Sequence, residues 1–119
     1  MADLSRVGAG AAGERRAERW YLERGYIVLD RNWRRPGGEI DLVVARSPVL
    51  VFVEVKWRRR ASHGGPGAAI DLRKAERVRA TAERWLVEHP EWGGRSGLRM
   101  RFDAALGVGA HLEVIEAAF

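Results

Sequence analysis

The 119-residue sequence lacks cysteine and contains no long apolar run. Without cysteine, a disulfide framework and a zinc site built from thiolates are excluded. No stretch reaches the ~18 apolar residues that a membrane-spanning helix needs, so no membrane contact is expected. The first six residues also lack the apolar run of a signal peptide. These absences predict a cytoplasmic protein, and the length predicts one domain over residues 1–119 with a single core.

Lysine is also scarce: of the 21 basic residues, only Lys56 and Lys74 are lysines. Residues 1–30 and 61–119 each carry equal numbers of acidic and basic side chains, whereas residues 31–60 carry eight basic and three acidic ones. The formal net charge of +5 therefore lies in one segment. Arginines around a few acids suit a nucleic acid, whose backbone phosphates need neutralising cations. The alternative is an arginine-rich, solvated surface.

Two short segments, 38–41 and 52–56, place carboxylates in otherwise apolar strands, and the second also contains a lysine. A buried carboxylate is costly unless something pairs with it. Carboxylate oxygens are the ligands that Mg²⁺ and Mn²⁺ prefer. Three acids and one amine on neighbouring strands therefore indicate a site for one of these ions.

The register of these two strands follows from the turn between them. Residues 46–49 (Arg-Ser-Pro-Val) favour a tight turn, so residue 46 is expected to pair with residue 49. That register places Asp41 opposite Glu54 and Glu39 opposite Lys56, with the Cβ atoms of each pair roughly 5 Å apart. Side chains alternate along a strand. The opposite face is therefore expected to be free of polar side chains, and comprises Ile40, Leu42, Val44, Val51, Val53 and Val55.

The remaining segments predict a scaffold of helices and strands. Helices are expected over 9–24, ending at Gly25, and over about 68–89, ending before Pro90. Further strands are expected near 26–33, 98–104 and 111–116. In the order α-β-β-β-α-β-β, a helix joins the third and fourth strands, which favours a parallel arrangement of these two.

Asp41 followed by Glu54-Val55-Lys56 on the next strand resembles the D…(D/E)xK motif of restriction-endonuclease-like nucleases. More closely, the chain resembles the small bacterial YraN-like family, which is similar in fold to archaeal Holliday-junction resolvases. The matching positions are Gly13-Glu14, Arg31-Asn32-Trp33, Gly38-Glu39-Ile40-Asp41, Phe52-Val53-Glu54-Val55-Lys56-Trp57-Arg58, Phe102-Asp103 and Ala118-Phe119. The resemblance implies an α/β fold of the restriction-endonuclease-like αβββαββ type, with a central mixed sheet flanked by helices.

The resemblance also implies a metal-dependent endonuclease that hydrolyses phosphodiester bonds, with branched DNA as one candidate substrate. Asp41 and Glu54 are then expected to hold Mg²⁺ or Mn²⁺, and Glu14 on the first helix to join them. Lys56 is expected to orient or deprotonate the attacking water. Glu39 is a further ligand, a partner of Lys56 or a solvated residue. For Glu14 the alternative is an ordinary first-turn acid that interacts with the helix dipole.

A second group of residues is expected to contact nucleic acid, with DNA as the expected partner: Arg34, Arg35, Arg58, Arg59, Arg60 and Lys74. Lys74 matches a basic position of the family, and its alternative is a solvated helix face. Asp103 is interpreted as a structural ion-pair partner, and Trp33 and Trp92 are candidates for base stacking. Resolvase relatives suggest a homodimer. The rival hypotheses are a non-catalytic nucleic-acid-binding protein on the same fold and a protein-interaction adaptor.

Overall fold

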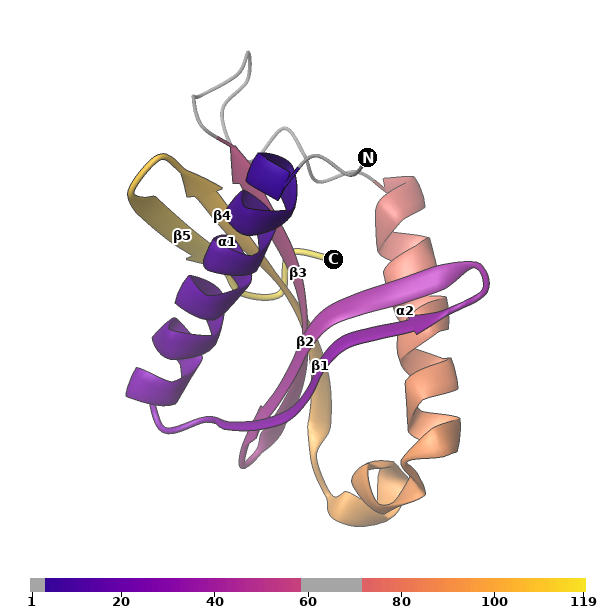
Figure 1. Cartoon of the computed structure of the whole chain (residues 1–119). Helices are drawn as coiled ribbons and strands as arrows, with labels where there is room; N and C mark the ends of the chain where they lie inside the picture. Colours follow the sequence, from indigo (N-terminus) through magenta and orange to yellow (C-terminus); the bar gives the residue numbers. More distant parts are fainter. Residues whose placement is uncertain (1–3, 59–71) are drawn as a thin grey trace.

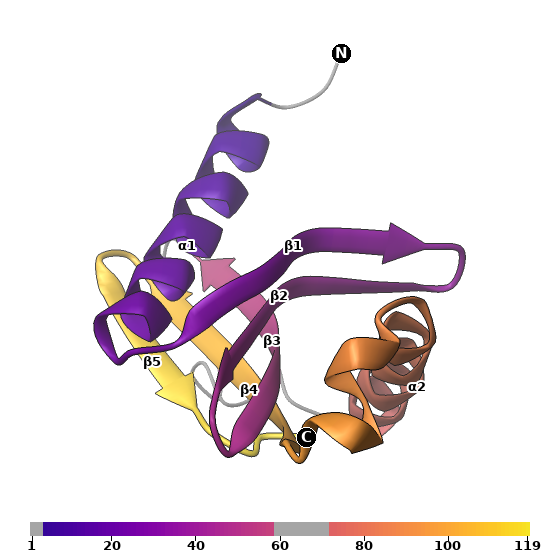
Figure 2. The ribbon, with the colours of Figure 1, turned by 90° about the horizontal axis from the view of Figure 1, so that it is seen from below.

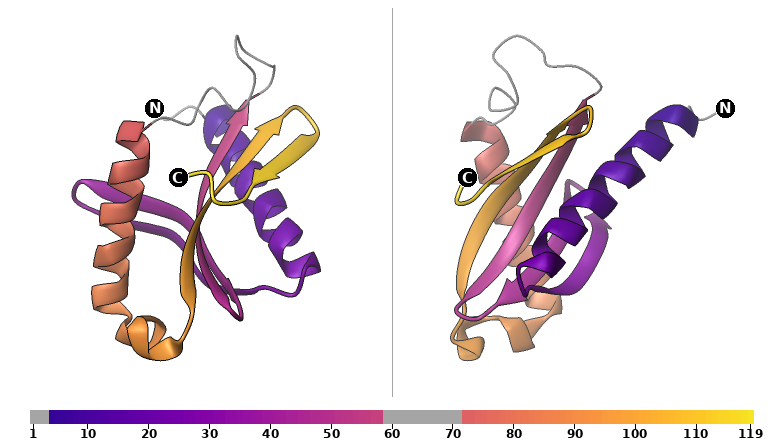
Figure 3. Two further views of the ribbon diagram at one scale, coloured as in Figure 1. Left: turned by 180° about the vertical axis from the view of Figure 1, so that it is seen from behind. Right: turned by 90° about the vertical axis from the view of Figure 1, so that its left-hand side faces the viewer.

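The computed structural model describes the backbone of residues 4–58 and 72–119. In these ranges a five-stranded sheet lies between two long helices (Figures 1 and 3). The elements, in chain order, are α1 (Leu4–Glu23), β1 (Ile27–Arg35), β2 (Gly38–Arg46), β3 (Val49–Arg58), α2 (Leu72–Glu88), the 3-10 turns η2 (Pro90–Trp92) and η3 (Gly94–Ser96), β4 (Arg99–Val108) and β5 (His111–Ile115). The predicted mixed α/β class and element order are confirmed.

The ends of the helices follow local backbone chemistry. Helix α1 stops before Gly25, whose φ of 84° is the left-handed conformation that glycine adopts at little cost. Helix α2 ends at Glu88, before Pro90, as predicted. The described part of α2 begins at Leu72, so residues 68–71 of the predicted helix lie outside the described residues. No helix within 4–58 or 72–119 is long and apolar enough to cross a membrane.

The strands lie in the spatial order β1-β2-β3-β4-β5. Only β3 and β4 are parallel, as the helical connection between them predicted. The turn between β2 and β3 has the predicted register, with Arg46 opposite Val49. The β2–β3 ladder then ends at the pair Leu42 and Val53. Beyond that pair β2 leaves β3 and continues with β1 alone.

The part of β1 and β2 that leaves the sheet, residues 32–41, is called the arm. It is a two-stranded ribbon that passes across α2 (Figures 1 and 2). Arg35 Nε donates to Glu88 Oε2 at 2.9 Å, and Arg84 Nη1 donates to the Pro36 carbonyl at 2.6 Å. A Cβ placed on Gly38 would lie 2.2 Å from Oγ1 of Thr81. The arm is therefore fixed to α2 by two charged contacts and one glycine-dependent close approach.

Each face of the sheet packs against one of the two helices, so the protein has a hydrophobic core on both sides of the sheet. Ordinary alternation along β2 puts Val43 on the α2 side and Val44 on the α1 side. The α2-side core comprises Trp33, Ile40, Val43, Ala45, Leu50, Phe52, Val78, Ala82, Trp85 and Phe102. The α1-side core comprises Ala17, Tyr21, Tyr26, Leu42, Val44, Val51, Val53 and Ala105.

Alternation along β2 breaks at Asp41. Ile40 packs on the α2 side although Leu42 packs on the α1 side, so the prediction that the two share a face is wrong. The physical reason is the departure of β2 from β3 at this point, which turns the strand as it enters the arm. On the neighbouring strand, Asn32 has a positive φ of 48°, which marks the same bend. Asp41 thus sits where the strand turns over.

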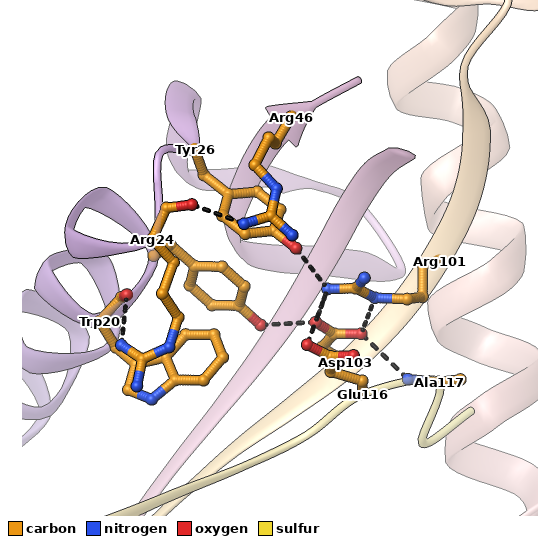
Figure 4. Close-up of polar contacts among 9 residues, drawn as sticks. Trp20, Arg24, Tyr26, Arg46, Arg101, Asp103, Glu116 and Ala117 are labelled. Atoms are coloured by element: carbon orange, nitrogen blue, oxygen red, sulfur yellow. Dashed lines mark hydrogen bonds and ion pairs between the residues drawn. The ribbon is translucent and has the colours of Figure 1, made fainter. Parts of the chain in front are cut away.

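A buried polar network joins α1, β4 and the C-terminal segment (Figure 4). Asp103 is fully buried and accepts hydrogen bonds from Tyr21 Oη at 2.7 Å, from the Ala117 amide at 3.0 Å and from Arg101 Nε and Nη2, each at 2.8 Å. Arg101 Nη2 also donates to Tyr26 Oη at 3.0 Å. Burial and then the Asp103 carboxylate raise the pKa of Tyr21 well above its ordinary value. The interpretation of Asp103 as a structural ion-pair partner is confirmed.

We expect Gly38→Ala to destabilise the protein by roughly 1–3 kcal/mol, because the added methyl group meets Thr81 and pushes the arm away from α2. Urea denaturation measures this change. The matched control is Gly94→Ala, where a Cβ would meet no described atom within 4 Å, and its effect should be small. In Thr81→Ala the two closest obstacles are gone, so the double variant should be less destabilised than the sum of the single ones. Additive effects would show that this close approach does not hold the arm.

Candidate functional site

Asp41 lies at the point where β2 and β3 separate. Its Oδ2 accepts a hydrogen bond of 2.7 Å from the backbone amide of Val55. That amide lies on the edge of β3 that faces β2, two residues beyond the last backbone pair of the β2–β3 ladder. The carboxylate therefore replaces a missing backbone partner. As a result, Asp41 is held in the gap between the two strands.

The charges of the other predicted acids act on the Asp41 carboxylate. The pKa of Asp41 is raised to about 7, chiefly because burial disfavours the charged form. The nearby carboxylates of Glu54, Glu14 and Glu39, in decreasing order, also raise it. The hydrogen bond from Val55 acts in the opposite direction. The structure thus brings each of the other three predicted acids within range of the Asp41 charge.

A pocket of about 170 Å³ opens on the α1 side of Asp41. Glu14 lines it from α1, which places this helix acid beside Asp41 as the resemblance implied. The full lining is Ala11, Glu14, Arg15, Glu18, Arg31, Asn32, Asp41 and Leu42. Sequence reasoning did not single out Arg15, Glu18, Arg31 or Asn32 as site residues. A signal was present, because Glu14 and Glu18 share a helix face and Arg31-Asn32 belongs to the family resemblance.

Glu54 forms an ion pair with a residue of α2. Lys74 Nζ lies 3.1 Å from Glu54 Oε1, and the two side chains are only 14% and 15% exposed. A solvated helix face is therefore the wrong interpretation of Lys74. Its predicted contact with nucleic acid stays a prediction, because Lys74 here neutralises a site carboxylate.

Glu39 and Lys56 do not face each other, so that prediction is wrong. Because the β2–β3 ladder ends before residue 41, Glu39 pairs with the other strand of the arm, where it lies opposite Arg34. The two side chains form an ion pair of 3.0 Å. Lys56 is exposed on β3 and has no ion pair with any side chain that the structure describes. The amine of the predicted motif is thus accessible to a ligand.

The basic residues predicted to contact nucleic acid are distributed along the arm and the end of β3. Arg34 is paired with Glu39, and Arg35 with Glu88, where the guanidinium holds the pKa of Glu88 below its ordinary range. The backbone of Arg58 ends β3, and nothing of its side chain is described. Arg59 and Arg60 lie outside the described residues.

The tryptophans serve the core. Trp33 is only 5% exposed and packs on the α2 side, so its proposed base-stacking role is wrong. Trp92 is partly buried against the same core. Trp57 packs against Gly107 of β4 and Gly13 of α1, where a Cβ would lie 1.9 Å and 3.0 Å from it, as expected for a packing residue.

The donor chemistry of the site fits a hard divalent cation. Asp41 is a half-buried carboxylate on which the charges of three other acids act, and a cation relieves the repulsion among such groups. Among the described residues, no three acidic or histidine side chains are already grouped closely enough to hold a metal ion. The acids lie on both sides of the sheet split, with Glu14 on the α1 side and Glu54 held from α2. The site therefore fits a divalent cation in the type of its ligands, which are carboxylates, and not in a ligand geometry that is already assembled.

Fold and site together define a mixed α/β protein with an acidic centre at the split of its sheet. Residues 13–106 match the family described as "Uncharacterised protein family UPF0102", and the chain belongs to this family. It is 51% identical over 80 residues to a UPF0102 protein of Beutenbergia cavernae, covering 67% of this chain and 68% of the relative. It is 45% identical over 97 residues to one of Rhodococcus jostii (82% and 79%). It is 39% identical over 111 residues to one of Pseudomonas putida (93% and 88%). The resemblance to the YraN-like family is confirmed.

We expect Asp41→Asn to stabilise the protein at pH 8 and to change its stability little at pH 4, in buffer with a chelator. The pKa of Asp41 is raised in the folded state, so between about pH 4 and 7 the unfolded chain releases this proton first. Folding free energy is lost as the pH rises through that window, in total by on the order of 4 kcal/mol. Asparagine removes this penalty, and its side-chain oxygen still accepts from Val55.

Denaturant titrations at both pH values measure this difference. Glu113→Gln, a change at an exposed carboxylate on β5, is the matched control and should alter stability little at either pH. Equal destabilisation by Asp41→Asn at pH 4 and pH 8 would contradict the burial of this charge.

Proposed function

We propose that this protein is a metal-dependent endonuclease of the restriction-endonuclease-like fold that hydrolyses phosphodiester bonds in nucleic acid. The observation that carries the proposal is the position of Asp41, a half-buried carboxylate with raised pKa at the split between β2 and β3. Glu54 and Lys56 follow on the adjacent strand, in the spacing of the nuclease motif. The observed order of helices and strands, with β3 and β4 parallel, is compatible with that fold.

Asp41, Glu54 and Glu14 would hold Mg²⁺ or Mn²⁺, because their oxygens suit hard cations. Such an ion supplies positive charge where negative charge develops on the phosphoryl group. The Asp41 carboxylate is fixed by Val55, and Lys74 forms an ion pair with Glu54 in a half-buried position. Glu39 contributes negative charge near Asp41 from the arm.

Lys56 would act on the attacking water. Its amine is exposed on β3, two residues after Glu54, and is therefore free to reach a substrate. A compact ammonium whose pKa can shift suits a role in orienting or deprotonating water, which a guanidinium does not share. The choice of lysine at this position in an arginine-rich chain agrees with that role.

The excess of basic residues in 31–60 would contact the phosphate backbone of the substrate. Arg34 and Arg35 on the arm, Arg58–Arg60 after β3, and Lys74 are the proposed contacts. DNA is the proposed substrate. Symmetric cleavage of two strands requires a homodimer, which is part of the proposal for branched DNA.

One observation favours a second candidate, a nucleic-acid-binding protein of the same fold that does not cleave. Two of the four acids already have cationic partners within the protein, because Glu54 pairs with Lys74 and Glu39 with Arg34. Such pairing neutralises two of the four acids without a metal ion. An arginine-rich surface then binds nucleic acid through its charge alone.

The experiment measures cleavage of labelled linear, flapped and four-way DNA, and of RNA, with Mg²⁺ or Mn²⁺. Wild type should cleave at least one substrate. Lys56→Ala should slow cleavage by on the order of 10²-fold or more while binding is largely retained. Arg95→Ala, a change at an exposed cation in η3, is the matched control for lost charge and should cleave like wild type.

The outcomes separate the candidates. Binding of DNA or RNA without cleavage by wild type would support the non-catalytic protein. Affinity that is no better than that of an unrelated basic protein, with little dependence on salt, would contradict both candidates.

A further inference from the structure

Asn32 has a backbone conformation that side chains rarely adopt in a strand. Its φ is +48°, and only one other non-glycine residue of the described ranges, Ala117, has a positive φ. Asparagine tolerates the left-handed region better than most residues, yet the conformation still costs free energy. Strained residues of this kind persist where the surrounding structure holds them, and they concentrate at functional sites.

Asn32 lies beside the central acid of the proposed site. In the β1–β2 ladder, Arg31 is opposite Leu42 and Trp33 is opposite Ile40, so Asn32 falls opposite Asp41. Both residues line the 170 Å³ pocket on the α1 side. The left-handed backbone separates the directions of its neighbours, because Trp33 is buried on the α2 side while Arg31 pairs with Glu18 of α1.

The side chain of Asn32 is exposed and has no hydrogen-bond partner among the described residues. In the same pocket, Arg31 and Glu18 form an ion pair, and Asp41 binds the Val55 amide. Asn32 is thus a lining residue with uncommitted N–H donors. A cation at this position would pair with Asp41 and compete for it. A neutral amide offers two N–H groups to an anion without neutralising the acids.

We propose that Asn32 is a substrate-binding residue, whose side-chain amide donates to a phosphate oxygen of the nucleotide next to the bond that is cut. This inference rests on the proposed nuclease function and adds the α1-side pocket to it as the seat of that nucleotide. Asn32 lines that pocket and falls opposite Asp41 in the β1–β2 ladder.

The test compares Asn32→Gly with Ala117→Gly. Glycine accepts positive φ at both positions, so each variant keeps the backbone, but only the first removes an amide. Three quantities are measured: the Kd for labelled DNA in Ca²⁺, KM and kcat for cleavage in Mg²⁺, and the urea midpoint. Asn32→Gly should weaken binding and raise KM by roughly 10- to 100-fold, as for a lost hydrogen bond to a charged group, without lowering the midpoint. Ala117→Gly should bind and cleave like wild type.

A second variant keeps the inference testable if Asn32→Gly folds poorly. Asn32→Asp preserves the shape and the tolerance of positive φ, but replaces both donors with acceptors. It should bind DNA more weakly than wild type, with its urea midpoint retained. Binding equal to that of wild type in Asn32→Asp, or in a folded Asn32→Gly, overturns the role of Asn32 and leaves the nuclease proposal standing. Wild type that neither binds nor cleaves nucleic acid overturns both.

Discussion

The hydrogen bond from the Val55 amide to Asp41 joins β2 and β3 at the point where their backbones separate. A sheet can split only if the amides and carbonyls exposed at the split find other partners. Here a side-chain carboxylate provides one, and it is thereby drawn out of water. The same contact closes the ladder and positions the central acid, so the local fold and the candidate chemistry depend on a single residue.

Burial of Asp41 near three other carboxylates is unfavourable for the folded protein by itself. The protein offsets part of this repulsion with its own cations, because Lys74 pairs with Glu54 and Arg34 pairs with Glu39. Of these two cations, Lys74 lies on α2 and Arg34 lies on the arm. Stability at the site therefore depends on the docking of the arm, which Gly38 permits by its lack of a side chain. Clusters of like charge that still reduce folding stability after such pairing are common at functional sites, where selection acts on activity and not on stability.

Features that depend on neighbours along the chain were predictable. The turn at 46–49 fixed the β2–β3 register, and the helical connection fixed the parallel pairing of β3 and β4. Asp103 was recognised as a structural acid from the arginines on its strand. The split itself was not predictable, because beyond it the arm packs on α2 through residues that are distant in sequence, such as Gly38 and Thr81.

The consequences of the split were missed for the same reason. Strict alternation placed Ile40 with Leu42 and Glu39 with Lys56, and both expectations assume that β2 follows β3 to its end. The left-handed conformation of Asn32 likewise leaves no local signature beyond the residue type, since asparagine is also common in ordinary turns. Periodicity describes a regular strand, and the candidate site lies where the strand stops being regular.

The split also explains how residues from two separate layers can act on one ligand. In an unbroken sheet, Glu14 from the α1 layer and Glu54 held from α2 would be separated by a continuous ladder of backbone. Asp41 sits in the opening, where the charges of both reach it. The arm that carries Asp41 is held on α2 by Arg35, which donates to Glu88, and by Arg84, which donates to the Pro36 carbonyl. These contacts between the arm and α2 therefore help to position Asp41 between Glu14 and Glu54, although none of them touches Asp41.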